Sequence, residues 1–413
     1  GKWNFNYSRR EYLTLAEQYR RNGIKQMIAY CHSPKWLGGG NRTYPKDIAG
    51  AKISWTAMLN KMGFDWFALE AWNEPDIGFS SNMPADQYMT FTRMLASAMR
   101  HADSKLPLVG GVFAHYNKAF ITTSIENGLL ECSDIISFHT YEDADKLVKL
   151  TEKYQNTFAK YGHREIPLWI SEAGLLYTGE GKFSDWRFSS ARDIVRKAVE
   201  AKACGITKFF PFVYVAWEYR GRKTGLMNLN DSPRRLWASY ITAKRILANK
   251  KFIGELSPKA VSCSNKVFDN GNGTATVVNF PGEPDLELTF DCKLKFDQLI
   301  GADGREMSVS TGKVPAPDGV CYGIIRLASI KSSLQKSRQQ KSSQKNGIKR
   351  NSDKYDWNII PAANLSRAEF SPCSTGYIAM NTGKAKTVSA RVYNTSNKAS
   401  LIKASYSARA EST

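Results

Sequence analysis

The feature that most limits the possible folds is a strict alternation of short apolar runs and helical patterns up to about residue 250. The apolar runs have the length of buried strands and lie at 24–30, 66–72, 107–113, 134–139, 167–171 and 208–215. Helical patterns lie around them, at 9–22, 46–61, 86–104, 118–129, 143–161, 187–204 and 234–248. Continuous apolar strands that alternate with helices are typical of a parallel sheet covered by helices.

The material after the strands separates two parallel architectures. Polar and aromatic residues follow nearly every strand, at 33–40, 73–80, 139–141, 172–183 and 217–227. Loops of this kind after most strands favour a (β/α)8 barrel, since a doubly wound open sheet concentrates its site at one switch point. A barrel has eight strands, and residues 1–5 resemble the loop that leaves a second strand. We therefore predict an α/β fold: a TIM barrel over residues 1–250 that lacks its first one to two βα units, truncated at the N-terminus.

The pattern changes after residue 250. Short β-like runs separated by Asn-Gly and Asp-Gly turns predict a small antiparallel β-sandwich over 251–330. Residues 331–354 are rich in Ser, Gln and Lys and are predicted to be a basic linker. Residues 355–413 regain aromatic residues and predict a partial β-rich domain.

Charge and cysteine content bear on partners. The net charge is +20, of which residues 331–413 carry +11 (15 Lys and Arg against 4 Asp and Glu). A basic tail is usually a solvated surface, so we expect no nucleic-acid partner, although a basic interaction module on an inert scaffold is the alternative. No run of 18 apolar residues suggests a membrane span. Seven cysteines show no zinc-type spacing, and one pair among Cys263, Cys292 and Cys321 is a candidate disulfide.

Two glutamates stand where a strand gives way to a loop. Glu74 belongs to Trp-Asn-Glu-Pro at 72–75, and Glu172 belongs to Trp-Ile-Ser-Glu-Ala-Gly at 169–174. Alternation through the strand would put Glu70, Trp72 and Glu74 on one side, with Glu74 in the barrel mouth. Two carboxyl groups that face each other across a sugar are what hydrolysis of a glycosidic bond requires. The alternatives are a solvated turn glutamate at 74 and a buried rim salt bridge at 172.

Other polar and aromatic residues lie at the same strand ends. Asn73 can hold a sugar hydroxyl, while His139 or Tyr141 can donate a hydrogen bond to Glu172 and keep it ionised. Trp217 is a candidate floor for the sugar site, and Trp36 a candidate for an outer subsite. His139 could equally be structural, and both tryptophans could be rim packing.

These motifs resemble those of clan A retaining glycoside hydrolases, with families 39 and 5 the most similar. The resemblance covers roughly residues 1–250. It implies Glu74 as the acid/base, Asn73 as a contact of the sugar 2-hydroxyl, and Glu172 as the nucleophile. His139 and Tyr141 match the sixth-strand pattern, and the eighth-strand tryptophan is matched by Trp217. The family also has an arginine at the end of its second strand, which would lie upstream of Gly1.

The resemblance implies a double-displacement mechanism on an oligosaccharide or polysaccharide with O-glycosidic, β-type bonds, without a metal or cofactor. The carboxyl groups should then lie about 5–5.5 Å apart, whereas an inverting enzyme needs about 6.5–9.5 Å. The main alternative is a non-catalytic carbohydrate-binding barrel. We also expect a secreted or periplasmic location.

Overall fold

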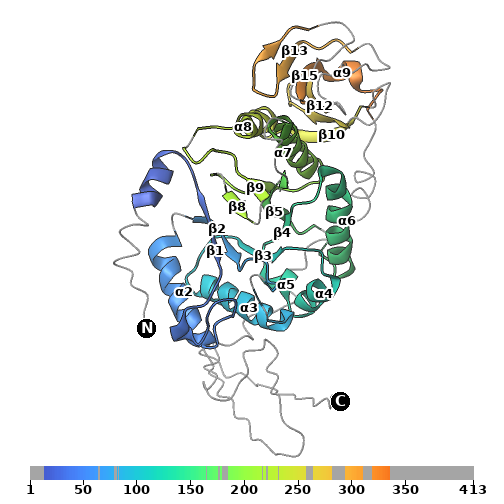
Figure 1. Cartoon of the computed structure of the whole chain (residues 1–413). Coiled ribbons are helices and arrows are strands. Elements are labelled where there is room, and N and C mark those ends of the chain that lie inside the picture. Colours follow the sequence, from blue (N-terminus) through green and yellow to red (C-terminus); the bar gives the residue numbers. More distant parts are fainter. Residues whose placement is uncertain are drawn as a thin grey trace, which may run out of the picture.

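The computed structural model describes residues 14–334 except 64–65, 79–80, 82, 164, 175–176, 179–184, 216, 220–221, 231, 257–263, 281–293 and 310–318. The side chains of 175–190, 216–224 and 264 are also outside the description. Within these limits the chain folds into a curled parallel sheet surrounded by helices, with a separate antiparallel sheet beside α7 and α8 (Figure 1).

The parallel sheet contains all six strands expected from the apolar runs. They are β1 (Gln26–Tyr30), β2 (Trp66–Ala71), β3 (Leu108–Phe113), β4 (Ile135–Thr140), β5 (Leu168–Ala173) and β7 (Lys208–Pro211). Their spatial order is β1-β2-β3-β4-β5-β7, so each strand pairs with the next parallel strand along the chain. An open doubly wound sheet would reverse its order at a switch point. The observed order is therefore that of a half-barrel; a complete eight-stranded barrel is not confirmed.

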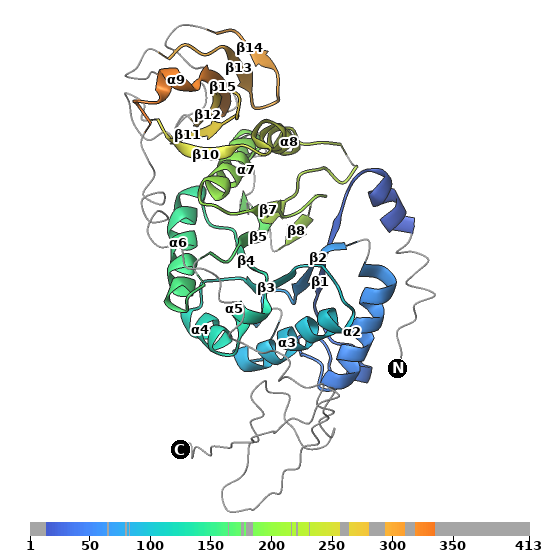
Figure 2. The same cartoon turned by 180° about the vertical axis from the view of Figure 1, so that it is seen from behind.

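Helices cover the outer face of this sheet, as the two opposite views show (Figures 1 and 2). Residues 14–21 are helical. The longer helices are α2 (Ile48–Met62), α3 (Ala85–His101), α4 (Lys118–Glu126), α6 (Ala144–Lys160), α7 (Asp185–Ala203) and α8 (Arg235–Leu247), and the short ones are η1 (Lys35–Leu37) and α5 (Leu129–Cys132). Side chains cap two of the N-termini: Asp47 accepts from the Gly50 amide and Asn117 from the Phe120 amide.

The central strands are apolar because both of their faces are covered. Every residue of β3 and β4 is buried. Toward the helices they contribute to a large core that also takes Trp72, Tyr88 and Phe91, while Val109, Ile135 and Trp169 form a second cluster with Ala68. The two clusters lie on opposite faces of the sheet, as alternation along a strand requires. The strand ends are thereby held by packing on both sides.

Residues after 250 form one antiparallel sheet in the described part of the chain. Its strands are β10 (Lys251–Glu255), β11 (Ser264–Asp269), β12 (Thr274–Phe280), β13 (Gln298–Gly301), β14 (Glu306–Met307) and β15 (Cys321–Arg326), in the order β10-β11-β12-β15-β13-β14, followed by α9 (Leu327–Ile330). The β-rich character predicted for this region is therefore present. Two facing sheets are not found among the described residues, so the expected sandwich is not confirmed.

The antiparallel sheet shares a core with the last two long helices. Val195 and Val199 of α7 and Leu236 of α8 belong to the same buried cluster as Phe268 and Tyr322 of the antiparallel sheet. Lys266 of β11 also reaches α7, where its Nζ lies 3.2 Å from Glu200 Oε2. Elements on both sides of the boundary predicted at residue 250 therefore pack into one buried cluster.

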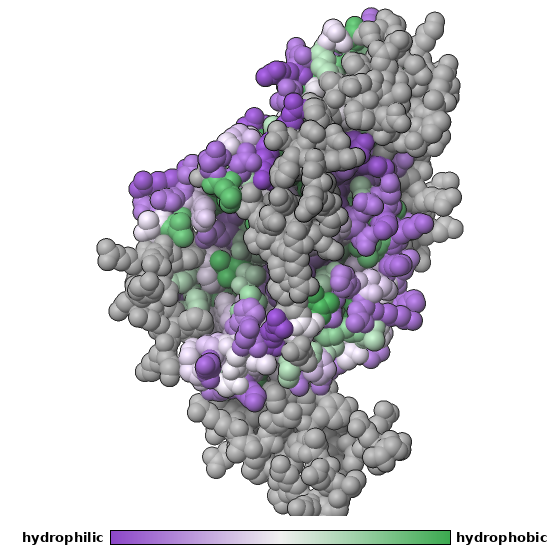
Figure 3. All heavy atoms as spheres, viewed as in Figure 1, coloured by the Kyte–Doolittle hydropathy of each residue, from purple (hydrophilic) through white to green (hydrophobic). Residues whose placement is uncertain are grey.

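Several predictions concern the remaining segments. Cys321 is a free, buried thiol, and its candidate partners Cys263 and Cys292 lie outside the described residues, as do most of the predicted linker and all of 355–413. On the face seen in Figure 3 the described surface is mainly hydrophilic with separate hydrophobic spots. No helix in the described ranges is long and apolar enough to cross a membrane.

Candidate active site

Glu74 stands on a sharp turn just beyond β2. Trp72 and Glu74 both have positive φ, at 77° and 47°, which ends the extended strand. The Glu74 amide donates to the Val112 carbonyl at 3.0 Å. Asp76 accepts from the amides of Ala114 and His115 at 2.8 and 3.0 Å. The turn is therefore fastened to the end of β3, and this fixes the direction of the Glu74 side chain.

The expected alternation through Glu74 is not observed. Trp72 is fully buried on the helix side, where its ring centroid lies 5.3 Å from that of Phe91 in α3. Glu70 instead accepts a hydrogen bond from Ser137 of β4 at 3.1 Å. The physical reason is the left-handed backbone at Trp72, which interrupts the two-residue period before Glu74 is reached.

Glu172 is aimed by an irregularity in the pairing of β5. The register between β4 and β5 shifts between Phe138 and His139, so that Glu172 lies opposite His139. The pairing of β5 with β7 shifts as well, between Ile170 and Ala173. An extra residue in one strand of a pair reverses which side chain faces a given direction. A bulge therefore brings Glu172 onto the side that faces His139.

Tyr141 holds the Glu172 carboxylate directly. Its hydroxyl donates a hydrogen bond to Glu172 Oε1. Burial, followed by the negative charge of Glu172, raises the pKa of Tyr141 far above its usual range. The raised pKa favours the protonated hydroxyl, which can donate a hydrogen bond to the carboxylate.

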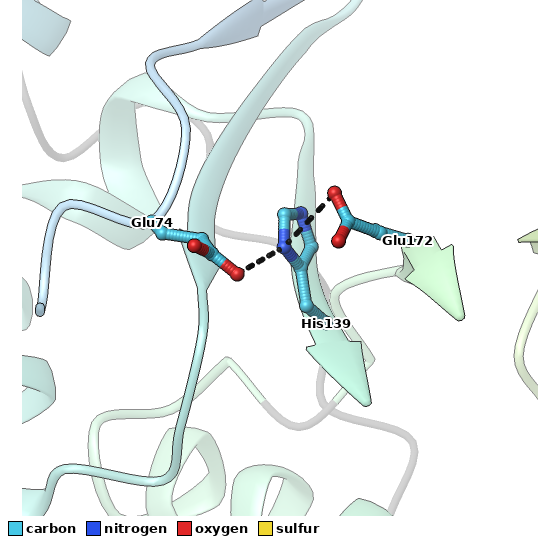
Figure 4. A group of neighbouring side chains, drawn as sticks. All are labelled: Glu74, His139 and Glu172. Atoms are coloured by element: carbon cyan, nitrogen blue, oxygen red, sulfur yellow. Dashed lines mark hydrogen bonds and ion pairs between the residues drawn. The ribbon is translucent and has the colours of Figure 1, made fainter. Parts of the chain in front are cut away.

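His139 lies between the two glutamates. Its Nδ1 is 3.0 Å from Glu74 Oε1 and 3.6 Å from Glu172 Oε2 (Figure 4). Burial lowers the pKa of His139, but the hydrogen bond to Glu74 and the charges of Glu172 and Glu70 outweigh it, so the net pKa is raised. The imidazole can thus hold a proton that faces both carboxylates, whose side chains are 13% and 21% exposed.

The structure brings both glutamates into one small group. A carboxylate oxygen of Glu74, a ring nitrogen of His139 and a carboxylate oxygen of Glu172 lie within 4.8 Å of one another. Two carboxylates and an imidazole are also donors that a divalent cation accepts. A metal ion here would have to displace the proton that the raised pKa of His139 favours. Chemically, the arrangement can hold two carboxylates on either side of one bond and move a proton beside them.

Glu70 of β2 supplies a third carboxyl group, near His139 and Glu172. Glu70 is buried, with 4% of its surface exposed. Burial is the largest influence on its pKa and raises it, although the nearby His139 acts in the opposite direction. The group is therefore biased toward its neutral form.

The other predicted site residues are placed less centrally. Asn73 is half-buried beside Glu74. Trp36, in η1, is half-buried and packs against the main core, and its predicted role in an outer subsite stays a prediction. Trp217 begins β8 (Trp217–Tyr219), which pairs with β9 (Arg222–Thr224) and, through it, with β6 (Tyr177–Thr178). The Trp217 side chain is outside the described residues, so its predicted role stays a prediction.

One buried side chain near Glu172 was missed by sequence reasoning. Lys197 of α7 is 1% exposed, and its Nζ donates to the Gly174 carbonyl at 2.8 Å. A sequence signal existed: Lys197 lies three residues after Ile194 and four before Ala201, so it falls in the buried stripe of its helix.

Comparison with known proteins gives a family match and a fold match. Residues 46–240, just under half of the chain, match the family model described as the glycosyl hydrolase catalytic core. No curated protein matches the sequence.

The fold resembles several solved structures at low identity. One is a family 39 glycoside hydrolase from the gut symbiont Bacteroides cellulosilyticus WH2, with a TM-score of 0.61 and 14% identity over 76% of this chain and 71% of that chain. A monomeric beta-xylosidase from Caulobacter crescentus CB15 gives a TM-score of 0.53 and 17% identity over 76% and 83%. A conserved exported protein from Bacteroides fragilis gives 0.57 and 12% over 75% and 78%.

Proposed function

We propose that this chain, a glycoside hydrolase by its catalytic core, cleaves β-glycosidic bonds with retention of anomeric configuration. The observation that carries the proposal is the closeness of Glu74 and Glu172, which each have a carboxylate oxygen within 4.8 Å of the other beside His139. Retaining enzymes hold their two carboxyl groups about 5–5.5 Å apart, while inverting enzymes leave room for a water at about 6.5–9.5 Å. The short separation supports direct attack by a carboxylate.

In this proposal Glu172 is the nucleophile and Glu74 the acid/base. Glu172 forms a bond to the anomeric carbon while the bond to the leaving oxygen breaks, and that oxygen takes a proton from Glu74. Glu74, now a carboxylate, takes a proton from a water whose oxygen attacks the same carbon. The bond to Glu172 then breaks, and both carboxyl groups return to their starting states.

His139 and Tyr141 support these steps from the side. The Nδ1 of His139 is 3.0 Å from Glu74 Oε1, so transfer of the imidazolium proton prepares Glu74 as an acid. The Tyr141 hydroxyl, bonded to Glu172 Oε1, fixes the orientation of the nucleophile. Both side chains come from the end of β4 and so act on neighbouring strand ends.

The substrate we propose is an oligosaccharide or polysaccharide. Asn73, next to Glu74, is assigned the 2-hydroxyl of the reacting sugar, and Trp217 and Trp36 are assigned stacking contacts with sugar rings. We place the enzyme outside the cytoplasm, secreted or periplasmic, a location supported by the fold similarity to an exported protein.

The test is turnover of a panel of aryl β-glycosides, with the first-formed product followed by NMR. The wild type should release the β-anomer first. Glu172→Ala with added azide should give an α-glycosyl azide. Glu74→Ala with azide should give the β-glycosyl azide, because azide then takes the place of the water that attacks the carbon bonded to Glu172. Glu126→Gln, a change of a glutamate outside the site, is the control.

Two results would remove the proposal. An α-anomer as the first product would make the enzyme inverting. Sugar binding that survives in both glutamate variants, with no turnover in the wild type, would make the chain a carbohydrate-binding protein instead.

A further inference from the structure

We propose that Lys197 of α7 is a positioning residue that keeps Tyr141 and Glu172 in register, an inference that rests on the proposed role of Glu172. It acts through the backbone at Gly174, two residues beyond Glu172, and among the described residues it forms no hydrogen bond or ion pair with either glutamate. The argument has three links: the lysine and the Gly174 carbonyl, the Gly174 backbone and the Tyr141 ring, and the Tyr141 hydroxyl and Glu172.

The first link is a buried lysine with a specific acceptor. Lys197 is 1% exposed, and its Nζ donates to the Gly174 carbonyl at 2.8 Å. No ion pair of Lys197 is present among the described residues, so the backbone carbonyl is its main partner. An apolar side chain of similar size would be buried here at no electrostatic cost. What the lysine adds is therefore the hold on this carbonyl.

The second link is a close approach of Tyr141 to Gly174. A Cβ on Gly174 would lie 2.0 Å from Tyr141 Cε1, so the ring rests directly on the glycine backbone. The strand end is fixed from two other directions. The Gly174 amide donates to the Thr140 carbonyl at 3.4 Å, and the Phe212 amide donates to the Ala173 carbonyl at 2.7 Å. Lys197 adds a constraint from the helix side.

The third link is the hydrogen bond that the ring presents to the site. The Tyr141 hydroxyl bonds to Glu172 Oε1, so a shift of the ring is a shift of the donor relative to the nucleophile. Displacements of about 1 Å can cost about a hundredfold in rate when they misplace a reacting group. Loosening Gly174 should thus act on the chemical step more than on substrate binding.

The charges around Lys197 fit a side chain held for its hydrogen bond. Burial lowers the pKa of Lys197 to about 8, against the opposing effect of Asp143, Asp193 and Glu142. The ammonium and the neutral amine both carry N–H groups, so the bond to the Gly174 carbonyl exists on either side of this pKa.

The first experiment is structural and needs no substrate. Crystal structures of the full chain are compared for the wild type, Lys197→Met and Lys202→Met, the last being a control on the same helix. In Lys197→Met we expect the Tyr141 hydroxyl and Glu172 to move beyond hydrogen-bond distance, and in Lys202→Met to stay paired. Lys197→Gln, whose shorter side chain falls short of Gly174, replaces the methionine variant if that does not fold. An unchanged Tyr141–Glu172 pair overturns the proposal.

The second experiment is a double-mutant cycle of Lys197→Met and Tyr141→Phe on an aryl glycoside. We expect kcat to fall about tenfold or more in each single variant with KM changed less than about threefold. The double variant should be no slower than the worse single variant, because both changes break one chain of contacts. Multiplying effects, or a loss of thermal stability with kcat unchanged, would make Lys197 merely structural. A wild type without turnover counts against the proposed function alone, since the crystal structures still decide the role of Lys197.

Discussion

Replacing Tyr141 by phenylalanine tests the site most directly, because it removes one oxygen atom and leaves the ring on Gly174. The lost interaction is the hydrogen bond from the hydroxyl to Glu172 Oε1. Hydrogen bonds to charged groups contribute about 1.5–3 kcal/mol. Since about 1.4 kcal/mol corresponds to a tenfold change in rate, kcat/KM should fall roughly 10- to 150-fold. The Glu172 side chain is 21% exposed, so water replaces part of the bond and favours the lower half of this range.

The assay is the initial rate on an aryl glycoside with a good leaving group, measured on protein whose folding is checked by circular dichroism. Tyr161→Phe is the matched control, because the Tyr161 hydroxyl also donates to a glutamate, Glu126 at 3.4 Å, but at the surface. The control should keep its full rate. A change below about twofold in Tyr141→Phe would refute the idea that this hydroxyl orients the nucleophile.

Three further predictions concern groups around the site and in the core. The raised pKa of His139 stabilises the folded state at pH values below the unfolded pKa of 6.5, and this stabilisation is lost as the pH rises through the folded pKa. Urea unfolding should therefore show that the wild type is more stable than His139→Gln at pH 5.5 and that the difference shrinks toward pH 8.5. Glu70 also has a raised pKa, so ionising it costs stability as pH rises above 4.5; Glu70→Gln should gain stability relative to the wild type from pH 4.5 to 8, and a constant difference would contradict this. Burial raises the pKa of Cys321 to about 12, so iodoacetamide at pH 8 should alkylate the exposed Cys31 and spare Cys321 until the protein is unfolded in urea, as peptide mass spectrometry would report.

The parallel strands were predictable because their apolar runs are continuous and most of them follow a helix that ends at a glycine. All six are present, and the match to the glycosyl hydrolase catalytic core agrees with the expected resemblance to glycoside hydrolases. The last strand is shorter than expected, ending at Pro211 instead of residue 215. Its final apolar residues leave the sheet, and Val215 instead forms an isolated bridge with Met227. An apolar run therefore indicates burial more securely than it indicates strand length.

The convergence of Glu74, His139 and Glu172 was also predictable, because parallel strands end at one edge of a sheet. The way each side chain is aimed was not. Two-residue alternation fails at Trp72, where φ is positive, and the bulge in β5 is needed to turn Glu172 toward His139. Such irregularities depend on contacts with neighbouring strands, which no local pattern encodes. The buried Lys197 was overlooked because a lysine is rarely placed in a core.

Helix α7 contacts two parts of the molecule. One face sends Lys197 to the backbone beside Glu172, and the other packs Val195 and Val199 against the antiparallel sheet. Removal of the residues after 250 would expose Val195 and Val199 to water. It would also loosen the helix whose Lys197 bonds to the backbone near Glu172. If Lys197 acts as proposed, removal of the residues after 250 should lower the melting temperature and the turnover together.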